Sequence, residues 1–385
     1  MKMLFNDGWQ FTKQKLGTPP DALDREGTEW SDVDLPHDWL IYDVNNLYET
    51  GEGWYRKVFI PDDIEGKVVS IRFEGVYMDS TVFVNGKTAG EWKYGYSTFE
   101  FDITKYLVPG ENEIKVRVVY QSPNSRWYSG AGIYRNVWLI TNDPAHFVSD
   151  GIYISARKSE DGWRVEIDAE IVDESGKCFS TSASGNCGPT AGDTDMPAGG
   201  TRNAVVRHSV IDAEGKMVAV SQQETALTGD TVTDSQAIHV AQPRLWSLED
   251  PYLYKLKSEL IADGEVKDTV IQNFGFRTIR FDCNEGFFLN DVHVKLHGVC
   301  QHHDLGALGA AVNKTALRRQ VTILKEMGVN SIRTSHNMPA VELMDLADEM
   351  GVLILSEAFD MWERKKTEYD YARFFGEWCE KDVAS

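Results

Sequence analysis

The first part of the chain alternates apolar and polar residues with a period of two, which is typical of β-strands that bury one face. Residues 114–120 (IKVRVVY) show this alternation, and residues 68–73 and 81–84 are short runs rich in β-branched and aromatic residues. Asn85-Gly86 directly follows the last of these runs and predicts a two-residue hairpin turn, because both turn positions need a positive φ. Since no helical period occurs here, we predict a β jelly-roll sandwich over residues 1–143.

A second β segment follows the first. Apolar and charged residues alternate over residues 163–171 (WRVEIDAEI), and the same pattern returns over residues 252–260. These signals predict an immunoglobulin-like β-sandwich over residues 144–278. A stretch rich in Gly, Ser, Thr and Ala, residues 177–203, interrupts this segment, and we interpret it as a flexible surface insertion.

Towards the end of the chain, strand-like runs alternate with helical ones. Residues 294–299, 331–335 and 352–355 predict three strands, of which the last is apolar throughout, as expected of a strand buried on both faces. Between them, apolar residues recur at helical spacing over 314–327 and 339–350, and each helix is followed by a glycine that can end it.

A third helix is predicted from about Asp370, which completes the order β-α-β-α-β-α. This order begins a parallel (β/α)₈ TIM barrel, which takes about 250 residues in full. We therefore predict that residues 279–385 are the first three βα units of such a barrel. We also expect the sequence to be the N-terminal part of a longer, multidomain protein.

The composition excludes several classes of protein. Hydrophobic residues make up 42% and charged residues 26% of the 385 positions, as in globular rather than disordered chains. The net charge of −21 argues against nucleic acid or an anionic membrane as a partner. There is no apolar run of about 18 residues and no recognisable secretion signal. The odd number of widely spaced cysteines favours reduced thiols and a cytoplasmic location, although Cys178 and Cys187 could pair across their loop.

Polar side chains gather directly after each of the three predicted barrel strands. In parallel barrels the functional site lies at these carboxyl ends. Polar groups from successive strands that face one mouth suit a polyhydroxylated ligand, which takes many hydrogen bonds. The candidate substrate-binding residues, in strand order, are His302, Asp304, Arg333, His336, Asn337, Glu357, Asp360 and Trp362.

Each of these residues also has a structural interpretation. The segment 302–304 could form a solvated turn or part of a metal site, but its spacing fixes no third ligand, so we favour ligand contact. Asn337 could cap the following helix as readily as it could bind a ligand. Arg333 could pair with Glu357, because an inward-facing guanidinium needs a partner. Trp362 could belong to the core or provide a platform for a sugar ring.

Several well-known catalytic motifs are missing from the chain. The glycines at 306–309 lack the spacing of a nucleotide-binding fingerprint, and no Gly-x-Ser-x-Gly elbow or Cys-x-x-Cys pair occurs. These absences disfavour dehydrogenases, kinases, serine hydrolases and zinc-ribbon proteins.

Short motifs are spread over nearly the whole length of the chain. They are the runs at 35–39 (LPHDW), 53–57 (GWYRK), 73–76 (FEGV), 84–86 (VNG), 125–135 (SRWYSGAGIYR, called the signature loop below), 245–247 (LWS), 251–254 (PYLY), 274–277 (FGFR), 296–304 (LHGVCQHHD) and 330–337 (NSIRTSHN). Each motif alone is moderately specific, but through their order the chain resembles glycoside hydrolase family 2, the family of β-galactosidases, β-glucuronidases and β-mannosidases.

The resemblance implies a retaining glycosidase. In such enzymes one carboxylic acid protonates the leaving oxygen and a second carboxylate, about 5–5.5 Å away, attacks the anomeric carbon. In this family the two glutamates follow the fourth and seventh barrel strands, so both are expected beyond Ser385, and this chain is expected to be inactive alone. The implied function is hydrolysis of terminal non-reducing β-D-galactosides. A β-glucuronidase of the same family and a non-catalytic carbohydrate-binding protein are the alternatives.

The resemblance also implies roles for individual residues. His302 and Asp304 match the loop that contacts the hydroxyl groups of the sugar. Arg333 matches an Arg that supports the catalytic carboxylates, and His336 matches a histidine of the sugar subsite. Glu357 matches an acidic position that binds magnesium in some members.

The sequence departs from the family at two positions. Members that bind magnesium at the position of Glu357 have a His two residues later, where this chain has Phe359, so we predict no cofactor, with magnesium at Glu357 as the alternative. Some β-galactosidases place an Asp of the signature loop against the sugar, where this chain has Ser125 and Arg126. The expected partners are a β-linked sugar, the remaining part of the enzyme in the same or another chain, and further copies in a homo-oligomer, with no nucleic acid or membrane.

Overall fold

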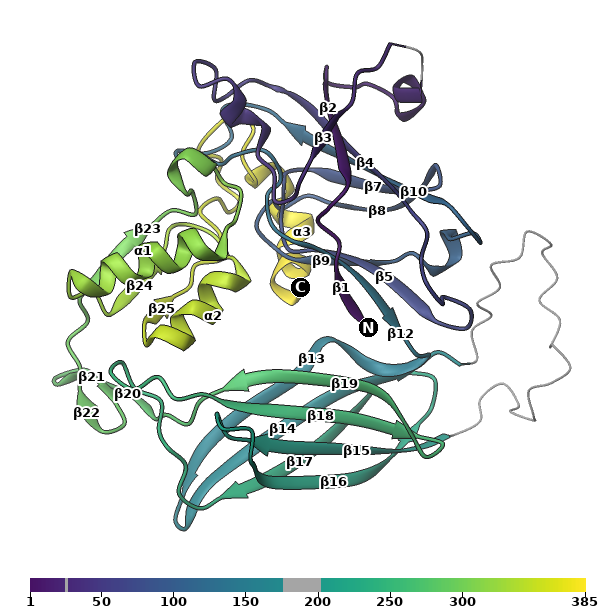
Figure 1. Ribbon diagram of the computed structural model, residues 1–385. Helices are drawn as coiled ribbons and strands as arrows, with labels where there is room; N and C mark the ends of the chain where they lie inside the picture. The colour runs from purple at the N-terminus through teal and green to yellow at the C-terminus, as the bar shows by residue number, and fades with distance from the viewer. Residues whose placement is uncertain (25–26, 176–201) are drawn as a thin grey trace, which may run out of the picture.

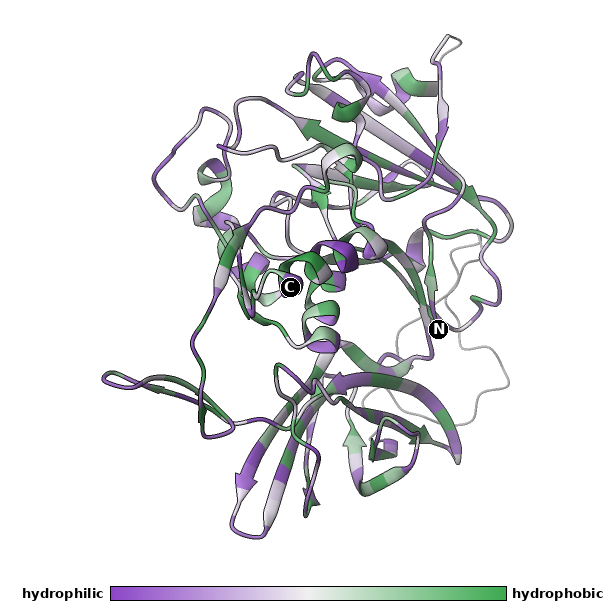
Figure 2. Ribbon diagram, turned by 60° about the vertical axis from the view of Figure 1, so that its left-hand side comes forward, coloured by the Kyte–Doolittle hydropathy of each residue, from purple (hydrophilic) through white to green (hydrophobic). Residues whose placement is uncertain are grey.

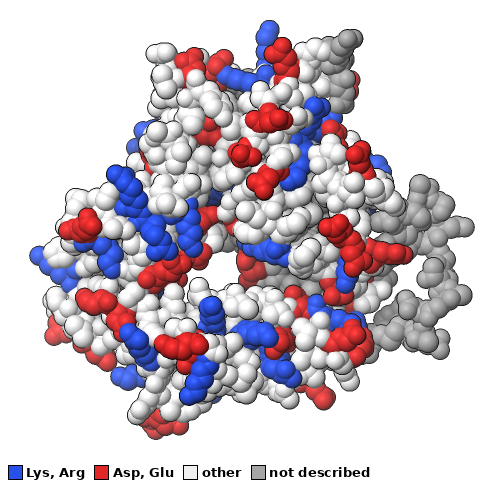
Figure 3. All heavy atoms as spheres, in the orientation of Figure 1, with Lys and Arg blue, Asp and Glu red and all other residues white. Residues whose placement is uncertain are grey.

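The computed structural model describes residues 1–24, 27–175 and 202–385, which form three bodies around a central opening (Figures 1 and 3). Two bodies are β-sandwiches, and the third is a small parallel α/β sheet with its helices. The predicted insertion at 177–203, and with it Cys178 and Cys187, falls almost wholly outside the described residues.

The first body is a sandwich of two antiparallel sheets with a shared apolar core. The strand orders are β1-β12-β5-β9 and β3-β2-β4-β10-β7-β8, and β11 pairs with β6 in a short ladder. Ile71 of β5 and Val116 of β10 are completely buried between the sheets. The strands are Lys2–Leu4 (β1), Trp9–Gln14 (β2), Ser31–Val33 (β3), Gly51–Phe59 (β4), Val68–Phe73 (β5), Val76–Tyr77 (β6), Ser80–Val84 (β7), Lys87–Trp92 (β8), Phe99–Asp102 (β9), Asn112–Tyr120 (β10), Gly132–Ile133 (β11) and Val137–Asn142 (β12).

The strands and the hairpin turn that the sequence predicts in this body are confirmed. β5 covers the predicted run 68–73, and β10 contains the alternating run 114–120. Asn85 and Gly86, with φ values of 50° and 75°, form the two-residue turn between β7 and β8. Both values lie in the left-handed region, which explains why Asn-Gly occupies this turn.

The second body is an immunoglobulin-like sandwich with strand orders β13-β14-β17 and β16-β15-β18-β19 (Figure 1). Along β14, Val165, Ile167 and Ala169 are completely buried, and the residues between them face outwards. The predicted alternation is therefore confirmed. The strands are Ala145–Ser159 (β13), Gly162–Asp173 (β14), Arg202–Ile211 (β15), Met217–Leu227 (β16), Val232–Val240 (β17), Tyr254–Ala262 (β18) and Glu265–Phe274 (β19).

A buried polar network crosses this second core from one sheet to the other. Asp234 of β17 accepts a hydrogen bond from Gln236 Nε2 at 2.7 Å and another from the Thr225 hydroxyl. The buried imidazole of His208 lies 3.8 Å from Asp234 Oδ1 and is hydrogen-bonded to the Ser258 hydroxyl at 2.8 Å. Because an unpaired buried carboxylate is costly, these partners are needed to keep Asp234 in the core.

Asp234 should therefore link the stability of the second sandwich to pH. Burial raises the pKa of Asp234, but the nearby imidazole of His208 and the hydrogen bonds from Thr225 and Gln236 outweigh burial and hold the pKa below its usual value. A carboxyl with a lowered folded-state pKa stabilises the fold above its unfolded pKa of about 3.9, and this contribution is lost as the pH falls through the folded value. We expect Asp234→Asn to lower stability at neutral pH but to flatten its dependence below about pH 4. Thermal unfolding at pH 2.5–7 measures this, and an unchanged acid slope would contradict it.

The third body is a parallel sheet in the order β23-β24-β25, with α1 and α2 packed on one face. The helix α3 packs against the first sandwich, where Trp378 contacts Trp92 with ring centroids 5.4 Å apart. A small antiparallel sheet, β20-β21-β22, precedes this body. The elements are Ile279–Asp282 (β20), Gly286–Leu289 (β21), Val292–His293 (β22), Gly298–Gln301 (β23), Lys314–Glu326 (α1), Ser331–Thr334 (β24), Val341–Met350 (α2), Leu353–Leu355 (β25) and Ala372–Ala384 (α3), with short 3₁₀ turns at Pro20–Asp24, Trp39–Tyr42, Thr104–Tyr106 and Gly306–Leu308.

The three predicted helices are confirmed, with small shifts at their ends. Asn313 caps α1, because its side chain accepts a hydrogen bond from Ala316 N at 3.0 Å. Gly351, with a φ of 67°, ends α2 in the left-handed conformation. The start of α2 lies two residues after Pro339. Among the described residues, no helix has the length and apolarity needed to cross a bilayer.

Two strand predictions in this body are wrong in part. The strand predicted at 294–299 begins only at Gly298. The backbone just before it is hydrogen-bonded to the side chain of Asn330 instead of to a neighbouring strand. This side chain accepts from His297 N and donates to Lys295 O, at 2.8 and 2.9 Å. The run 352–355 is not buried on both faces, since Leu355 is 63% exposed at the edge of the described sheet.

Buried polar contacts join the first sandwich to the third body. The carboxylate of Asp38 accepts a hydrogen bond from Ala310 N at 2.9 Å, and Arg135 donates to the carbonyl oxygen of Met338 at 2.8 Å. Arg135 also donates to the Tyr96 carbonyl oxygen at 2.9 Å. Because these groups are almost completely buried, the sandwich holds the loops that follow β23 and β24 in a defined position.

Candidate functional site

The candidate site lies at the carboxyl ends of β23, β24 and β25. On β24, Ile332 is buried against the helices, so its neighbour Arg333 points to the opposite face of the sheet. Strand pairing places Cys300, Arg333 and Leu355 side by side on that face. The sequence thus brings a guanidinium to the face that the helices leave open.

Arg333, His336 and Glu357 form a hydrogen-bonded group at this end of the sheet. Arg333 Nε donates to Glu357 Oε1 at 2.5 Å. His336 Nδ1 lies 3.0 Å from Glu357 Oε2 and 3.1 Å from Arg333 Nη2. When Nδ1 of His336 carries the hydrogen, it donates to the Glu357 carboxylate. In the other tautomer Nδ1 accepts a hydrogen bond from the Arg333 guanidinium. The ion pair between Arg333 and Glu357, which the sequence left as an alternative, is present, and it engages the glutamate beside a polar cleft.

Trp127 reaches this group from the first sandwich. Its ring stacks on His302, with 5.4 Å between ring centroids and 25° between planes, and lies 5.5 Å from the ring of His336. Its Nε1 donates to the hydroxyl of Tyr96 at 3.1 Å. The loop before β11 therefore forms one wall of the candidate site.

Burial keeps two histidines of this wall uncharged. Burial lowers the pKa of His302, and the neighbouring His336 lowers it further. Burial also lowers the pKa of His303 to about 3, and His303 Nε2 donates to the carbonyl oxygen of Ser129 at 3.0 Å. Both rings are therefore neutral at pH 7. Nδ1 of His302 is buried without a hydrogen-bond partner among the described residues, so it can exchange a hydrogen bond with a ligand.

Asn337 and Asp304 differ in their burial and in their hydrogen bonds. Asn337 is only 3% exposed, and its Nδ2 has no partner among the described residues. It does not cap α2, whose N-cap residue is Ala340, so the capping interpretation is wrong. Asp304 is partly exposed and makes no hydrogen bond to another described side chain, and its charge favours protonation of His302.

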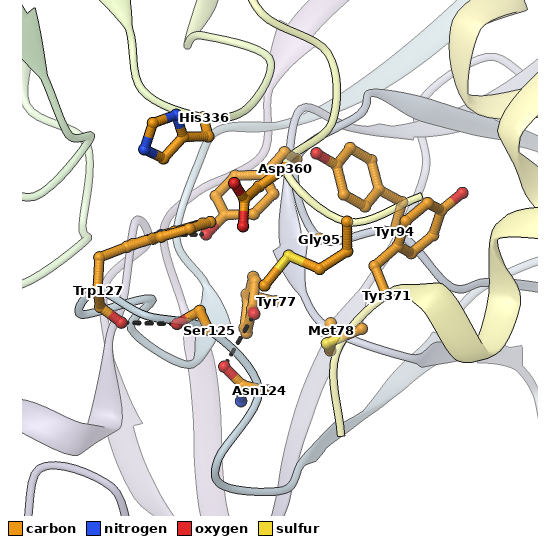
Figure 4. Close-up of a pocket in the computed structure, with 12 residues that line it drawn as sticks. Tyr77, Met78, Tyr94, Gly95, Asn124, Ser125, Trp127, His336, Asp360 and Tyr371 are labelled. Carbon is orange, nitrogen blue, oxygen red and sulfur yellow. Dashed lines mark hydrogen bonds between the residues drawn. The ribbon is translucent and has the colours of Figure 1, made fainter. Parts of the chain in front are cut away.

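An open cleft follows the third strand. Trp362 is 65% exposed and belongs to the wall of this cleft rather than to the core. An enclosed cavity lies beside the cleft, and His336 and Asp360 line both of them (Figure 4). The residues that line the cleft are Arg333, His336, Glu357, Ala358, Phe359, Asp360, Trp362, Arg364 and Lys366.

Phe359, which stands where magnesium-binding members of the family have a His, is part of a hydrophobic cluster. The ring of Phe359 stacks on Tyr371 with 5.5 Å between centroids, and it also contacts Tyr94 and Phe375. Within residues 1–24, 27–175 and 202–385, no three or more His, Cys, Asp or Glu side chains are grouped so that they could hold a metal ion. Phe359 thus offers no ligand atom to a metal at Glu357.

Sequence reasoning missed four residues of the site. Arg126 and Trp127 come from the motif at 125–135, whose loop the resemblance places near the sugar in some β-galactosidases, but neither side chain was assigned to the site. Arg364 and Lys366 follow the third strand within a charged run and line the cleft. A run of charges usually marks a solvated loop, so only the fold could place these two side chains at the site.

The fold has the architecture that the family resemblance implies. It consists of two β-sandwiches followed by parallel βα units with charged residues at the strand ends. Models of three domains of one family match the chain in order. They are the sugar-binding domain of glycosyl hydrolases family 2 over residues 27–143, the glycosyl hydrolases family 2 domain over 146–277, and the family 2 TIM barrel domain over 283–370. The chain belongs to glycosyl hydrolase family 2, which confirms the resemblance seen in its motifs.

Two curated relatives illustrate the similarity in sequence. The chain is 42% identical to the β-galactosidase BoGH2A of Bacteroides ovatus over 98% of this chain and 44% of the relative. It is 31% identical to a β-glucuronidase of Bacteroides fragilis over 84% of this chain and 46% of the relative. The chain thus spans about half the length of these relatives.

Solved structures show the same fold. A family 2 member from Bacteroides cellulosilyticus matches all of this chain and 49% of its own, with a TM-score of 0.88 and 31% identity. A β-glucuronidase of Bacteroides uniformis matches with a TM-score of 0.81 and 26% identity, again over the whole of this chain and 44% of its own. The three bodies described above therefore occur together, in the same arrangement, in known family 2 structures.

Proposed function

We propose that the whole protein hydrolyses terminal, non-reducing β-D-galactosides with retention of configuration, and that this chain supplies one wall of the sugar site. The observation that carries the proposal is the group of Arg333, His336 and Glu357 at the ends of adjacent parallel strands in a family 2 barrel. Function in such barrels lies at this end of the sheet.

The described carboxylates suit binding better than catalysis. Both oxygens of Glu357 face hydrogen-bond partners, so neither is free to attack an anomeric carbon. The resemblance implies an acid/base glutamate that directly follows an asparagine at the end of a barrel strand. The two Asn-Glu dipeptides of the chain, at 112–113 and 284–285, lie instead on β10 and in the turn between β20 and β21. In our proposal the acid/base and the nucleophile come from the rest of the protein, and Arg333 orients them through its remaining N–H groups.

The similarity to a β-galactosidase at 42% identity supports a galactoside as the substrate. A β-glucuronide is the second candidate, and Arg364 is the observation that favours it. Arg364 lines the cleft and makes no ion pair with another described residue, so a substrate carboxylate could pair with it.

A carbohydrate-binding module without catalytic activity would not need the cluster at the barrel strand ends. A cytoplasmic location and a homo-oligomeric state stay predictions.

The proposal is tested with the whole protein and with residues 1–385 alone. We expect the whole protein to cleave p-nitrophenyl β-D-galactoside faster than the β-D-glucuronide, and residues 1–385 alone to show only background rates. A 2-deoxy-2-fluoro galactoside should trap a covalent glycosyl-enzyme on a residue outside 1–385, which mass spectrometry of peptides locates. Inverted product in the NMR spectrum, or an adduct within 1–385, would contradict the proposal.

A further inference from the structure

Asp360 is held in an unusual way at the boundary of the candidate site. Its side chain is only 6% exposed. Arg126 Nη2 and Lys366 Nζ both donate to the same oxygen, Oδ1, at 2.7 and 2.8 Å. Lys366 also donates to the main-chain oxygen of Asp360 at 2.6 Å. One cation comes from the first sandwich and the other from the loop after β25, so two parts of the fold fix the orientation of one carboxylate.

The other carboxylate oxygen of Asp360, Oδ2, has no partner in the part of the chain that the structure describes. Oδ2 is buried, and no described residue donates a hydrogen bond to it. An unsatisfied buried carboxylate oxygen costs free energy, so its presence needs an explanation. Two cations that hold Oδ1 while Oδ2 stays vacant indicate a carboxylate prepared to accept a hydrogen bond from a ligand.

The position of Asp360 allows a substrate to reach it. Asp360 and His336 line both the open cleft and the enclosed cavity beside it. Figure 4 shows the carboxylate of Asp360 between the rings of Trp127 and Tyr94, below His336. A group bound in the cleft beside His336 therefore lies next to the carboxylate of Asp360.

We infer that Asp360 Oδ2 accepts a hydrogen bond from one hydroxyl group of the sugar, and that Arg126 and Lys366 are positioning residues for it. This inference rests on the proposed function and adds a residue that determines which sugar is accepted. Through Arg126, the first sandwich takes part in that selection although the site lies at the mouth of the barrel.

The charges around Asp360 specify the chemistry of the group that binds there. Two cations already neutralise the carboxylate, so a third cation gains little at this position. An anionic group has no hydrogen to donate to the vacant oxygen. A neutral O–H donor satisfies the vacant oxygen, and an analogue that lacks this hydroxyl leaves it unsatisfied, which is the basis of strong discrimination.

The test uses the whole protein, p-nitrophenyl β-D-galactoside and its monodeoxy analogues. We expect Asp360→Asn to lower kcat/KM on the parent substrate by about 10²-fold. On the one analogue that lacks the recognised hydroxyl, the same substitution should change kcat/KM less than about threefold, because the interaction is already absent. A loss of equal size on every analogue would overturn the inference, since it would mean that Asp360 only maintains the structure.

A pair of neighbouring lysines provides a matched control that does not disturb folding. Lys366→Met removes one of the two cations that hold Asp360, and it should raise KM and weaken discrimination between the parent and the same deoxy analogue by about tenfold. Lys365→Met, on the same exposed loop but without a described partner, should leave both unchanged. If the two lysine variants had the same KM and the same discrimination, Lys366 would not be a positioning residue for Asp360. If the wild-type protein cleaves neither galactoside nor glucuronide, the proposed function fails instead.

Discussion

Replacement of Asp38 by alanine is expected to destabilise the first sandwich by about 3–5 kcal/mol and to loosen its contact with the barrel segment. Asp38 is almost completely buried, and its two oxygens accept four hydrogen bonds. Truncation leaves these donors without an acceptor in a place that water reaches poorly. The donors are Leu40 N and Ala131 N at 3.1 and 3.0 Å on Oδ1, and Ala310 N and the Tyr128 hydroxyl at 2.9 and 2.6 Å on Oδ2.

The cost of this substitution should not be relieved by repacking. The surrounding backbone approaches Asp38 too closely to move in, since a Cβ atom placed on Gly309 would lie 2.4 Å from Asp38 Oδ2. Gly309 also has a φ of 60°, which favours glycine, so its loop is fixed in the conformation that presents Ala310 N. Asp38→Asn should cost less than Asp38→Ala, because the amide oxygen still accepts two of the four hydrogen bonds.

Chemical denaturation followed by tryptophan fluorescence measures the effect. Asp34→Ala, four residues earlier at an exposed position, is the control and should stay within about 0.5 kcal/mol of the wild type. Hydrogen exchange should show faster exchange of the Ala310 amide in the Asp38→Ala variant. A loss of stability below about 1 kcal/mol, with unchanged exchange at Ala310, would show that water replaces the carboxylate.

This interdomain role was beyond what the sequence could predict. Asp38 belongs to the LPHDW motif, which marked the family but carried no sign of contact with residue 310. Periodicity and turn chemistry are local, so they predicted several strands of both sandwiches, the Asn85-Gly86 turn and the three helices. The strand predicted at 294–299 failed because a distant side chain, that of Asn330, binds this segment.

The candidate site shows the same division between local and distant information. A rule about strand ends in parallel barrels placed His336 and Glu357 together, and the structure brings them into contact. Trp127 lies far from both in the sequence, and only the packing of the first sandwich against the barrel brings it over His302 and His336. Side chains contributed by another body of the fold have no local pattern by which they could be found.

The largest functional effect is expected from Arg333. In the whole protein, Arg333→Met should lower kcat/KM for the preferred glycoside by about 10²–10³-fold, the usual cost of removing a positioned charged donor from an active site. Without the guanidinium, Glu357 loses the hydrogen bond to Oε1, and His336 keeps only one of the two partners of its Nδ1. Cys300 also loses the hydrogen bond that, with Ser335, lowers the pKa of its thiol.

The choice of replacement separates charge from geometry. Arg333→Lys keeps the positive charge but cannot present the planar set of donors that reaches Glu357, Ser335 and Cys300 together, so it should recover less than a tenth of the lost activity. Steady-state rates from pH 5 to 9 measure both variants. Arg319→Met, on the exposed face of α1 without a described partner, is the control and should leave rate and profile unchanged. A wild-type rate for Arg333→Met would contradict the placement of the sugar site at the end of β24.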